Sequence, residues 1–158
     1  MKTNRSTSRL AAVQALYQQE LTGEDADKIL KDLLTGKIGR EVILENAYTD
    51  KEEYVPVIAP DPDLLTGIVK TYMRRKDDVE TLVKGCLKDD WTKEKTEILF
   101  WAILCAGVSE LIAFPENPVS VVINEYVDIT QSFYDSKSPE VRVANGIFHT
   151  VSETIREK

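Results

Sequence analysis

Residues 98–113 read ILFWAILCAGVSELIA, and this stretch decides the fold class. Apolar residues stand on nearly every side of the helix that it would form, so the helix has no polar face. Such a helix is normally the central one, covered by other helices. We expect it to begin at Lys93, after Trp91 as a hydrophobic staple and Thr92 as the N-cap, and to end near Ala113.

Amphipathic patterns flank this stretch on both sides. They run over residues 8–23, 24–36, 63–87, 118–133 and 139–156. The last two open with Asn117-Pro118 and Ser138-Pro139, each an N-cap followed by proline at the first helical position. No alternating strand pair with a hairpin turn competes with these helices. We therefore expect an all-α fold, a single-domain bundle of about seven helices around a buried central helix.

The chain has 158 residues, enough for one compact domain and too few for two. We therefore expect one domain over residues 1–158. Residues 36–62 interrupt the helical pattern with Gly36, Gly39 and three prolines. Within residues 24–63, eleven Asp and Glu stand against five Lys and Arg. We interpret residues 36–62 as an acidic, irregular excursion that is exposed to solvent.

The charge of the chain is unevenly distributed. A net charge of −7 argues against coating nucleic acid non-specifically. Residues 1–9, however, carry Lys2, Arg5 and Arg9 and no acid, so the rest of the chain has a net charge of −10. Any contact with nucleic acid must therefore be local.

The start of the first helix carries residue types that suit RNA. Arg5 and Arg9 are four positions apart and Gln14 and Tyr17 three, so each pair lies on neighbouring turns of a helix. Guanidinium groups for phosphate and a phenol for stacking are typical of sites for single-stranded RNA. The alternative is a frayed basic tail followed by a core tyrosine.

Signatures of enzymes, metal sites and membrane proteins are missing from the sequence. The single histidine, His149, has no Cys or carboxylate at ligand or triad spacing, and no phosphate-loop or nucleophile motif is present. Cys86 and Cys105 lack CxxC spacing, so we expect reduced core thiols. No apolar run is long enough to span a bilayer or act as a signal peptide. We expect a soluble, cytoplasmic protein without catalytic activity, metal or cofactor.

Three residues are unusual inside the predicted helices. Asn124, Asn145 and Gly146 are poor mid-helix residues, each costing about 0.5–1 kcal/mol relative to alanine. We interpret Gly146 as a site of close backbone packing and the two asparagines as partners of buried backbone groups. The alternative is direct contact with a ligand.

Short motifs are spread over nearly the whole chain apart from residues 36–62. They are RLAAVQALY at 9–17, LTGIVK at 65–70, LVKG at 82–85, IL at 103–104, SEL at 109–111, Pro118, VVINE at 121–125 and VANGI at 143–147. In this order they resemble the NusB family of transcription antitermination factors. The resemblance implies an all-helical NusB fold and no enzymatic activity. It also implies binding of the boxA element of nascent ribosomal RNA, together with ribosomal protein NusE, in the transcription elongation complex.

The resemblance also implies which residues contact RNA. Matched by position, the RNA-binding residues are Lys2, Arg5, Arg9, Gln14, Tyr17 and Arg142. The arginine-rich start of the family is thinner here. The family's late Lys-Phe-Val-Asn-Gly motif keeps its cation as Arg142 and loses its aromatic residue, which is Val143 in this chain.

A partner surface beside the central helix follows from the same resemblance. Glu94 is retained, whereas Phe100 replaces a polar contact and Ser109 replaces an aromatic residue. Glu94 and Phe100 are therefore the predicted contacts with NusE. Two alternatives remain for this surface: it has drifted, or residues 36–62 cover it.

Two other functions stay open on the sequence. One is the NusB-like RNA-binding module at the front of some rRNA cytosine methyltransferases, which would require a catalytic domain after Lys158. The other is a diverged helical scaffold without RNA binding, which the thin arginine arm leaves open. Because the chain ends in a polar tail, we expect the stand-alone factor.

Overall fold

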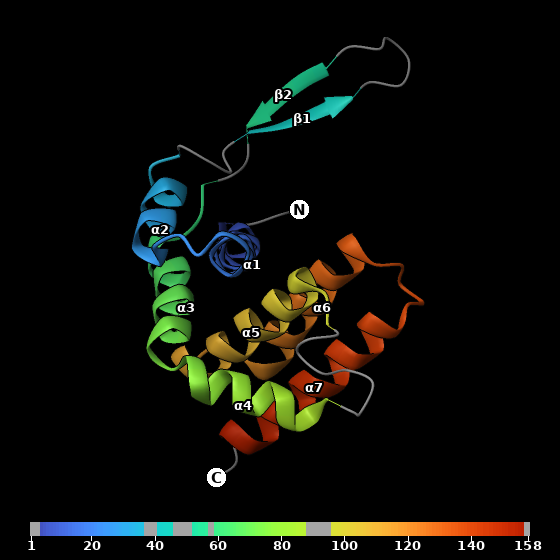
Figure 1. Ribbon diagram of the computed structural model, residues 1–158. Helices are drawn as coiled ribbons and strands as arrows, with labels where there is room; N and C mark the ends of the chain where they lie inside the picture. The colour runs from blue at the N-terminus through green and yellow to red at the C-terminus, as the bar shows by residue number, and fades with distance from the viewer. Residues whose placement is uncertain (1–3, 37–40, 46–51, 57–58, 88–95, 157–158) are drawn as a thin grey trace.

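The computed structural model describes residues 4–36, 41–45, 52–56, 59–87 and 96–156. Within these residues the chain forms seven helices (Figure 1). They are α1 (Asn4–Thr22), α2 (Ala26–Leu34), α3 (Pro62–Arg74), α4 (Lys76–Cys86), α5 (Ile98–Ala113), α6 (Val119–Phe133) and α7 (Pro139–Arg156). The predicted all-α bundle is confirmed.

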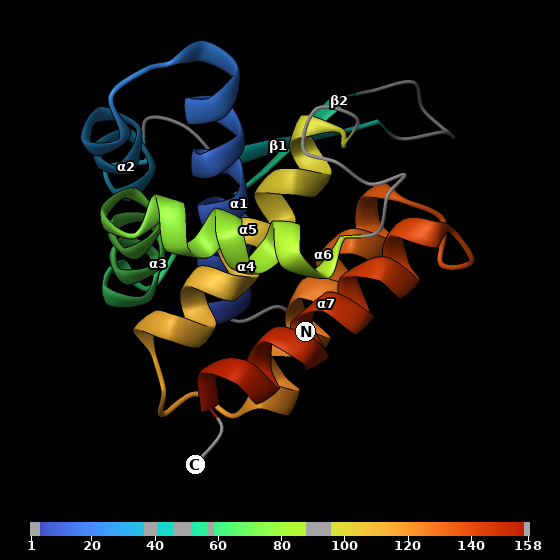
Figure 2. The ribbon, with the colours of Figure 1, turned by 60° about the horizontal axis from the view of Figure 1, so that its bottom comes forward.

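Helix α5 is the centre of the bundle, as its missing polar face predicts. Every residue from Phe100 to Leu111 is buried, and α1, α3, α4, α6 and α7 all pack against this helix (Figures 1 and 2). Its first residue is Ile98. The predicted start at Lys93 was therefore too early, because residues 96 and 97 are not helical. Trp91 and Thr92 lie outside the described residues.

The acidic segment contains a strand pair that the sequence reading excluded. Strands β1 (Glu41–Glu45) and β2 (Glu52–Pro56) pair antiparallel, with Glu41 opposite Pro56 and Glu45 opposite Glu52. They project away from the helices (Figure 1). The expectation of an irregular segment without a hairpin was therefore wrong for these ten residues. Val and Ile in β1, and Tyr and Val in β2, favour extended backbone, but five residues per strand give only a weak alternating pattern.

Close packing occurs at a different glycine from the predicted one. A Cβ added to Gly107 of α5 would lie 2.4 Å from the ring of Phe148 on α7, so this glycine lets the two helices approach. Gly146 is exposed, and a Cβ added there would meet no atom within 4 Å. Asn124 and Asn145 are exposed as well. The predicted roles of these three residues in close packing and in satisfying buried backbone groups were therefore wrong.

The start of α1 is anchored to the start of α3. The hydroxyl of Ser8 donates to the Asn4 carbonyl at 2.6 Å and accepts from the Asp61 amide at 2.6 Å. The predicted helix began at Ser8, but these bonds hold a further turn that begins at Asn4. The residues after Asn4 are therefore part of the folded body.

Candidate nucleic-acid interface

An ion pair buried in the protein joins the first helix to the central one. The side chain of Arg9 is 2% exposed and that of Glu110 is fully buried. The Arg9 Nε and Nη2 atoms each donate to the Glu110 carboxylate at 2.9 Å, which is a bidentate pair. Because this guanidinium cannot reach solvent, the predicted contact of Arg9 with RNA was wrong.

Three further groups complete the cluster around this pair. The Tyr126 hydroxyl donates to Glu110 at 3.0 Å, and the side-chain amide of Asn117 donates to it at 3.1 Å. The Nη1 atom of Arg9 lies 3.1 Å from the carboxylate of Glu125 on α6. Both oxygens of Glu110 are thus hydrogen-bonded, which is the condition under which a buried charge is tolerated. Helices α1, α5 and α6 meet at this point.

The cluster shifts the pKa of two of its members. Burial lowers the pKa of Arg9, but the hydrogen bond and the charge of Glu110 raise it more, so the pKa lies above its ordinary value. Burial, followed by the negative charge of Glu110, raises the pKa of Tyr126 well above 10. Both groups therefore keep their protons throughout the neutral range, and their hydrogen bonds to Glu110 persist.

The sequence carries a signal for this buried pair that the charge pattern hides. Arg9 lies in helical register with the buried Ala12, Val13 and Leu16, at the spacing of a core-facing stripe. Glu110 is the single acid among the sixteen residues of α5, and it lies within the buried stretch from Phe100 to Leu111. Charged residues are rarely buried unless they are paired, so a lone acid in a core helix and a lone cation in a core stripe indicate an ion pair between the two.

Arg5 is the accessible cation beside this cluster. Its side chain is 44% exposed, and its Nη2 atom donates to the side-chain carbonyl of Asn117 at 3.1 Å. The Nη1 atom lies 3.7 Å from the carboxylate of Asp61, the N-cap of α3. Lys2, the other cation predicted for this arm, lies outside the described residues. The structure therefore leaves Arg5 as the arm residue that can reach a phosphate.

Gln14 and Tyr17 lie on a different side of α1 from Arg5. Nine positions separate Arg5 from Gln14, about two and a half turns, so the two side chains point in opposite directions. Gln14 is exposed, whereas Tyr17 is half-buried and packs against the hydrophobic core. The structure does not bring the predicted arginine pair and glutamine–tyrosine pair together in one site.

Arg142 is also remote from Arg5. It is exposed near the start of α7 and lines a shallow pocket of about 610 Å³ with Gly85 and Cys86 of α4. The other end of α7 contacts the loop beside Arg5, where Arg156 donates to the Asn117 carbonyl. Fourteen helical residues separate the two ends, a distance of about 21 Å. An RNA that contacts both arginines would have to span this length.

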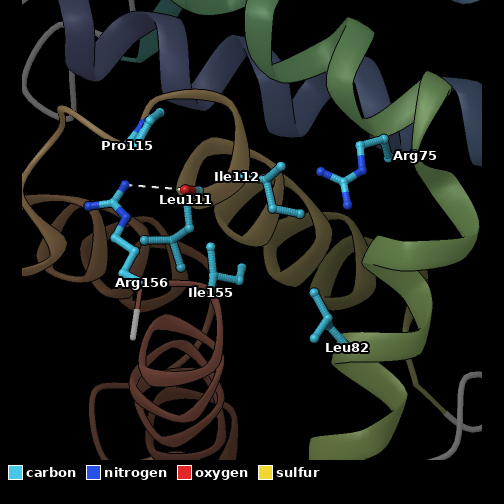
Figure 3. Close-up of a pocket in the computed structure, with 7 residues that line it drawn as sticks. All are labelled: Arg75, Leu82, Leu111, Ile112, Pro115, Ile155 and Arg156. Atoms are coloured by element: carbon cyan, nitrogen blue, oxygen red, sulfur yellow. Dashed lines mark hydrogen bonds between the residues drawn. The ribbon is translucent and has the colours of Figure 1, made fainter. Parts of the chain in front are cut away.

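Arg156 of α7 binds the loop after α5. Its guanidinium donates to the carbonyls of Phe114, at 2.8 Å, and Leu111, at 3.3 Å, and these lie at the carboxyl end of α5. A cation there compensates the unpaired carbonyls and the helix dipole. In Figure 3, Arg156 and Arg75 stand at opposite ends of a pocket of about 650 Å³. Its other lining residues are Leu82, Leu111, Ile112, Pro115 and Ile155.

The predicted partner contact at Phe100 is buried. This side chain is 1% exposed and packs edge-on against Tyr134, with ring centroids 5.8 Å apart. The prediction for Phe100 was therefore wrong, because a helix covered on all sides leaves its aromatic residues in the core. Glu94 lies outside the described residues.

Three apolar side chains are exposed at the ends of helices. They are Leu21 at 56%, Ile98 at 37% and Phe133 at 50%, from the end of α1, the start of α5 and the end of α6. A hydrogen bond of 2.8 Å from the Tyr134 hydroxyl to Glu97 joins the last two of these helix ends. We call Leu21, Ile98 and Phe133 the apolar surface.

Neither a metal cluster nor a membrane span occurs in the part of the chain that the structure describes. That part has no group of three or more His, Cys, Asp or Glu side chains placed to hold a metal ion. None of its helices is both long and apolar enough to cross a bilayer. His149 is exposed, Cys86 is half-buried and Cys105 is buried.

Comparison with known proteins identifies the family. The sequence model of the NusB family matches residues 6–153. The chain belongs to the NusB family. It is 36% identical to the transcription antitermination protein NusB of Sphingopyxis alaskensis, covering 98% of this chain and 96% of the relative. The NusB protein of Sinorhizobium fredii is 31% identical, with 96% of this chain and 88% of the relative covered. Membership of the NusB family confirms the resemblance seen in the motifs.

Solved NusB structures share the fold. NusB of T. maritima superposes with a TM-score of 0.72 at 20% identity, covering 97% of this chain and 93% of that one. A crystal structure of the antitermination factors NusB and NusE with double-stranded RNA gives a TM-score of 0.71 at 19% identity, covering 98% of this chain and 99% of that one. At these identities the likeness shows the NusB fold alone.

Proposed function

We propose that this chain is a cytoplasmic transcription antitermination factor that binds boxA-type single-stranded RNA of nascent ribosomal transcripts together with NusE, within the transcription elongation complex. The observation that carries the proposal is the match to the NusB family over residues 6–153. A protein of the same fold, the NusB of the crystal structure described above, is in complex with NusE and double-stranded RNA.

The charge around Arg5 supports weak binding of RNA by the chain alone. Asp61 lies 3.7 Å from Arg5, and Glu125 and the exposed Glu116 belong to the segments that meet there. A single accessible arginine among three carboxylates, on a chain of net charge −7, attracts phosphate only weakly. A basic partner protein would offset this negative field, so NusE strengthens binding.

The apolar surface is the docking site for NusE in this proposal. All three side chains are exposed, and Ile98 and Phe133 belong to the helix ends beside Phe100, where the family resemblance expected NusE to bind. On α1, Gln14 and Leu21 face away from Arg5 because sixteen positions are about four and a half turns. RNA and NusE would therefore reach the chain from opposite sides of α1, and neither would block the other.

The proposal is tested by titrating the protein with boxA-type RNA and with scrambled RNA, each with and without NusE. We expect weak binding by the protein alone, and stronger binding with preference for boxA when NusE is present. Equal affinity for the two RNAs in the presence of NusE would contradict the proposal.

The docking surface is tested separately, by measuring NusE binding without RNA. We expect Phe133→Asp to weaken the binding of NusE, because a carboxylate in an apolar contact loses its hydration. Val121→Asp is the matched control, since Val121 is 42% exposed near the start of α6, at the other end of that helix from Phe133. Equal affinity of both variants for NusE would place the docking site elsewhere.

A further inference from the structure

Asn117 connects the buried ion pair to the accessible arginine. It lies in the loop between α5 and α6 and is 8% exposed. Its side-chain nitrogen donates to Glu110 at 3.1 Å, and its side-chain oxygen accepts from Arg5 at 3.1 Å. Each end of the amide is therefore bonded to a charged group of the opposite polarity.

These two partners fix the orientation of the amide. The Glu110 carboxylate can only accept a hydrogen bond, and the Arg5 guanidinium can only donate one. If the amide were reversed, its NH₂ group would face the guanidinium and its oxygen would face the carboxylate, which is repulsive at both ends. A side chain with one donor and one acceptor, held in one orientation, is what this position requires.

The loop that carries Asn117 is held on both sides. The backbone nitrogen of Asn117 donates to the Phe114 carbonyl at 2.9 Å, and the backbone carbonyl of Asn117 accepts from Arg156 of α7. The side-chain oxygen of Asn117 is thus a rigid, buried acceptor beneath the exposed Arg5. In contrast, the carboxylate of Asp61 lies 3.7 Å from Arg5 and is 28% exposed, and such an exposed pair is weak.

We propose that Asn117 is a positioning residue for the contact between Arg5 and an RNA phosphate. Its side-chain oxygen holds the guanidinium at the edge of the buried cluster, where the carboxylate of Asp61 is no closer than 3.7 Å. The inference rests on the proposed function, because it assigns a role to Asn117 only through Arg5. Without the amide, Arg5 keeps its charge but turns to the neighbouring carboxylates, which compete with phosphate.

A double-mutant cycle tests this role. The affinity for a boxA-type RNA oligonucleotide in the presence of NusE is measured for wild type, Arg5→Ala, Asn117→Ala and the double variant. Affinities are expressed per folded molecule, with the folded fraction taken from thermal melts. Asn124→Ala is the matched control, since Asn124 is exposed on α6.

We expect Arg5→Ala to weaken binding about threefold, the size of one exposed ionic contact, and to lower the salt slope by about 0.7. Asn117→Ala should weaken binding by a similar factor and also lower the slope. The double variant should bind no more weakly than Arg5→Ala, because Asn117 acts through Arg5. Asn124→Ala should bind as wild type does.

The outcomes separate the two proposals. If Arg5→Ala leaves the affinity and the salt slope unchanged, the phosphate contact of the proposed function fails, and the positioning role fails with it. If Arg5→Ala weakens binding but Asn117→Ala does not, or if the two losses multiply, the positioning role alone is overturned. Should Asn117→Ala fail to fold, Asn117→Ser keeps a hydroxyl that can donate to Glu110, and the same cycle applies to it.

Discussion

Replacing Arg9 by alanine should lower the free energy of unfolding of the protein. The substitution removes both bonds of the bidentate pair and leaves the fully buried carboxylate of Glu110 without its counter-charge. Breaking a buried ion pair from one side costs about 3–5 kcal/mol, against a total of about 5–15 kcal/mol for a domain. With a urea dependence of about 2 kcal/mol per molar, the unfolding midpoint should fall by about 1.5–2.5 M.

Equilibrium urea unfolding followed by circular dichroism measures this shift. Arg5→Ala is the matched control, because it removes the same side chain one helical turn earlier, where the guanidinium is 44% exposed. We expect it to change the free energy of unfolding by less than about 1 kcal/mol. If Arg9→Ala and Arg5→Ala gave equal midpoints, the buried pair would be refuted, and Arg9 would again be a candidate for contact with phosphate.

Three more predictions concern glycine packing, alkaline pH and the thiols. Gly107→Ala should destabilise the fold by about 1–3 kcal/mol through overpacking, whereas Gly146→Ala should be neutral or stabilise it by up to about 1 kcal/mol; urea midpoints that move together would contradict this. Because the folded pKa of Tyr126 is raised, its contribution to stability is complete below its unfolded pKa of about 10 and is lost as the pH rises above that value. Midpoints at pH 9 and 11 should therefore differ less in Tyr126→Phe than in wild type. Burial raises the pKa of Cys86, and Cys105 is fully buried. A thiol reagent at neutral pH should therefore modify Cys86 slowly and Cys105 more slowly still. Equal rates would contradict the burial of Cys105.

The sequence predicted the parts of the fold that depend on local pattern. The apolar run at 98–113 identified the central helix, because a helix with no polar face has to be covered. Proline at position 139 marked the first residue of α7. By contrast, Pro118 is the N-cap of α6, and the side chain of Asn117 bonds to Glu110 instead of capping that helix. Residue types therefore predicted where the helices lie, whereas contacts with distant residues decided at which residue a helix begins.

The candidate site was harder to predict because its main contacts are long-range. A positive arm read from composition alone treats Arg5 and Arg9 alike, yet one helical turn places the first at the surface and the second in the core. The partner of Arg9 is 101 positions away in the chain, so no local pattern specifies it. Phe100 could not be assigned to surface or core on its own, since α5 gives no polar side for reference. Solvent exposure of single residues therefore required the tertiary structure.

The distance along the chain between Arg9 and its partner has a consequence for synthesis of the protein. Helix α1 leaves the ribosome before α5, because the carboxylate that neutralises Arg9 is made 101 residues later. At about 5–20 residues per second, the helix waits about 5–20 s for that partner. During this interval its apolar stripe and its arginine cannot be buried together. Helix α1 can pack against α2 and α3 before then, but the face that carries Arg9 is completed only when α5 and α6 have been made.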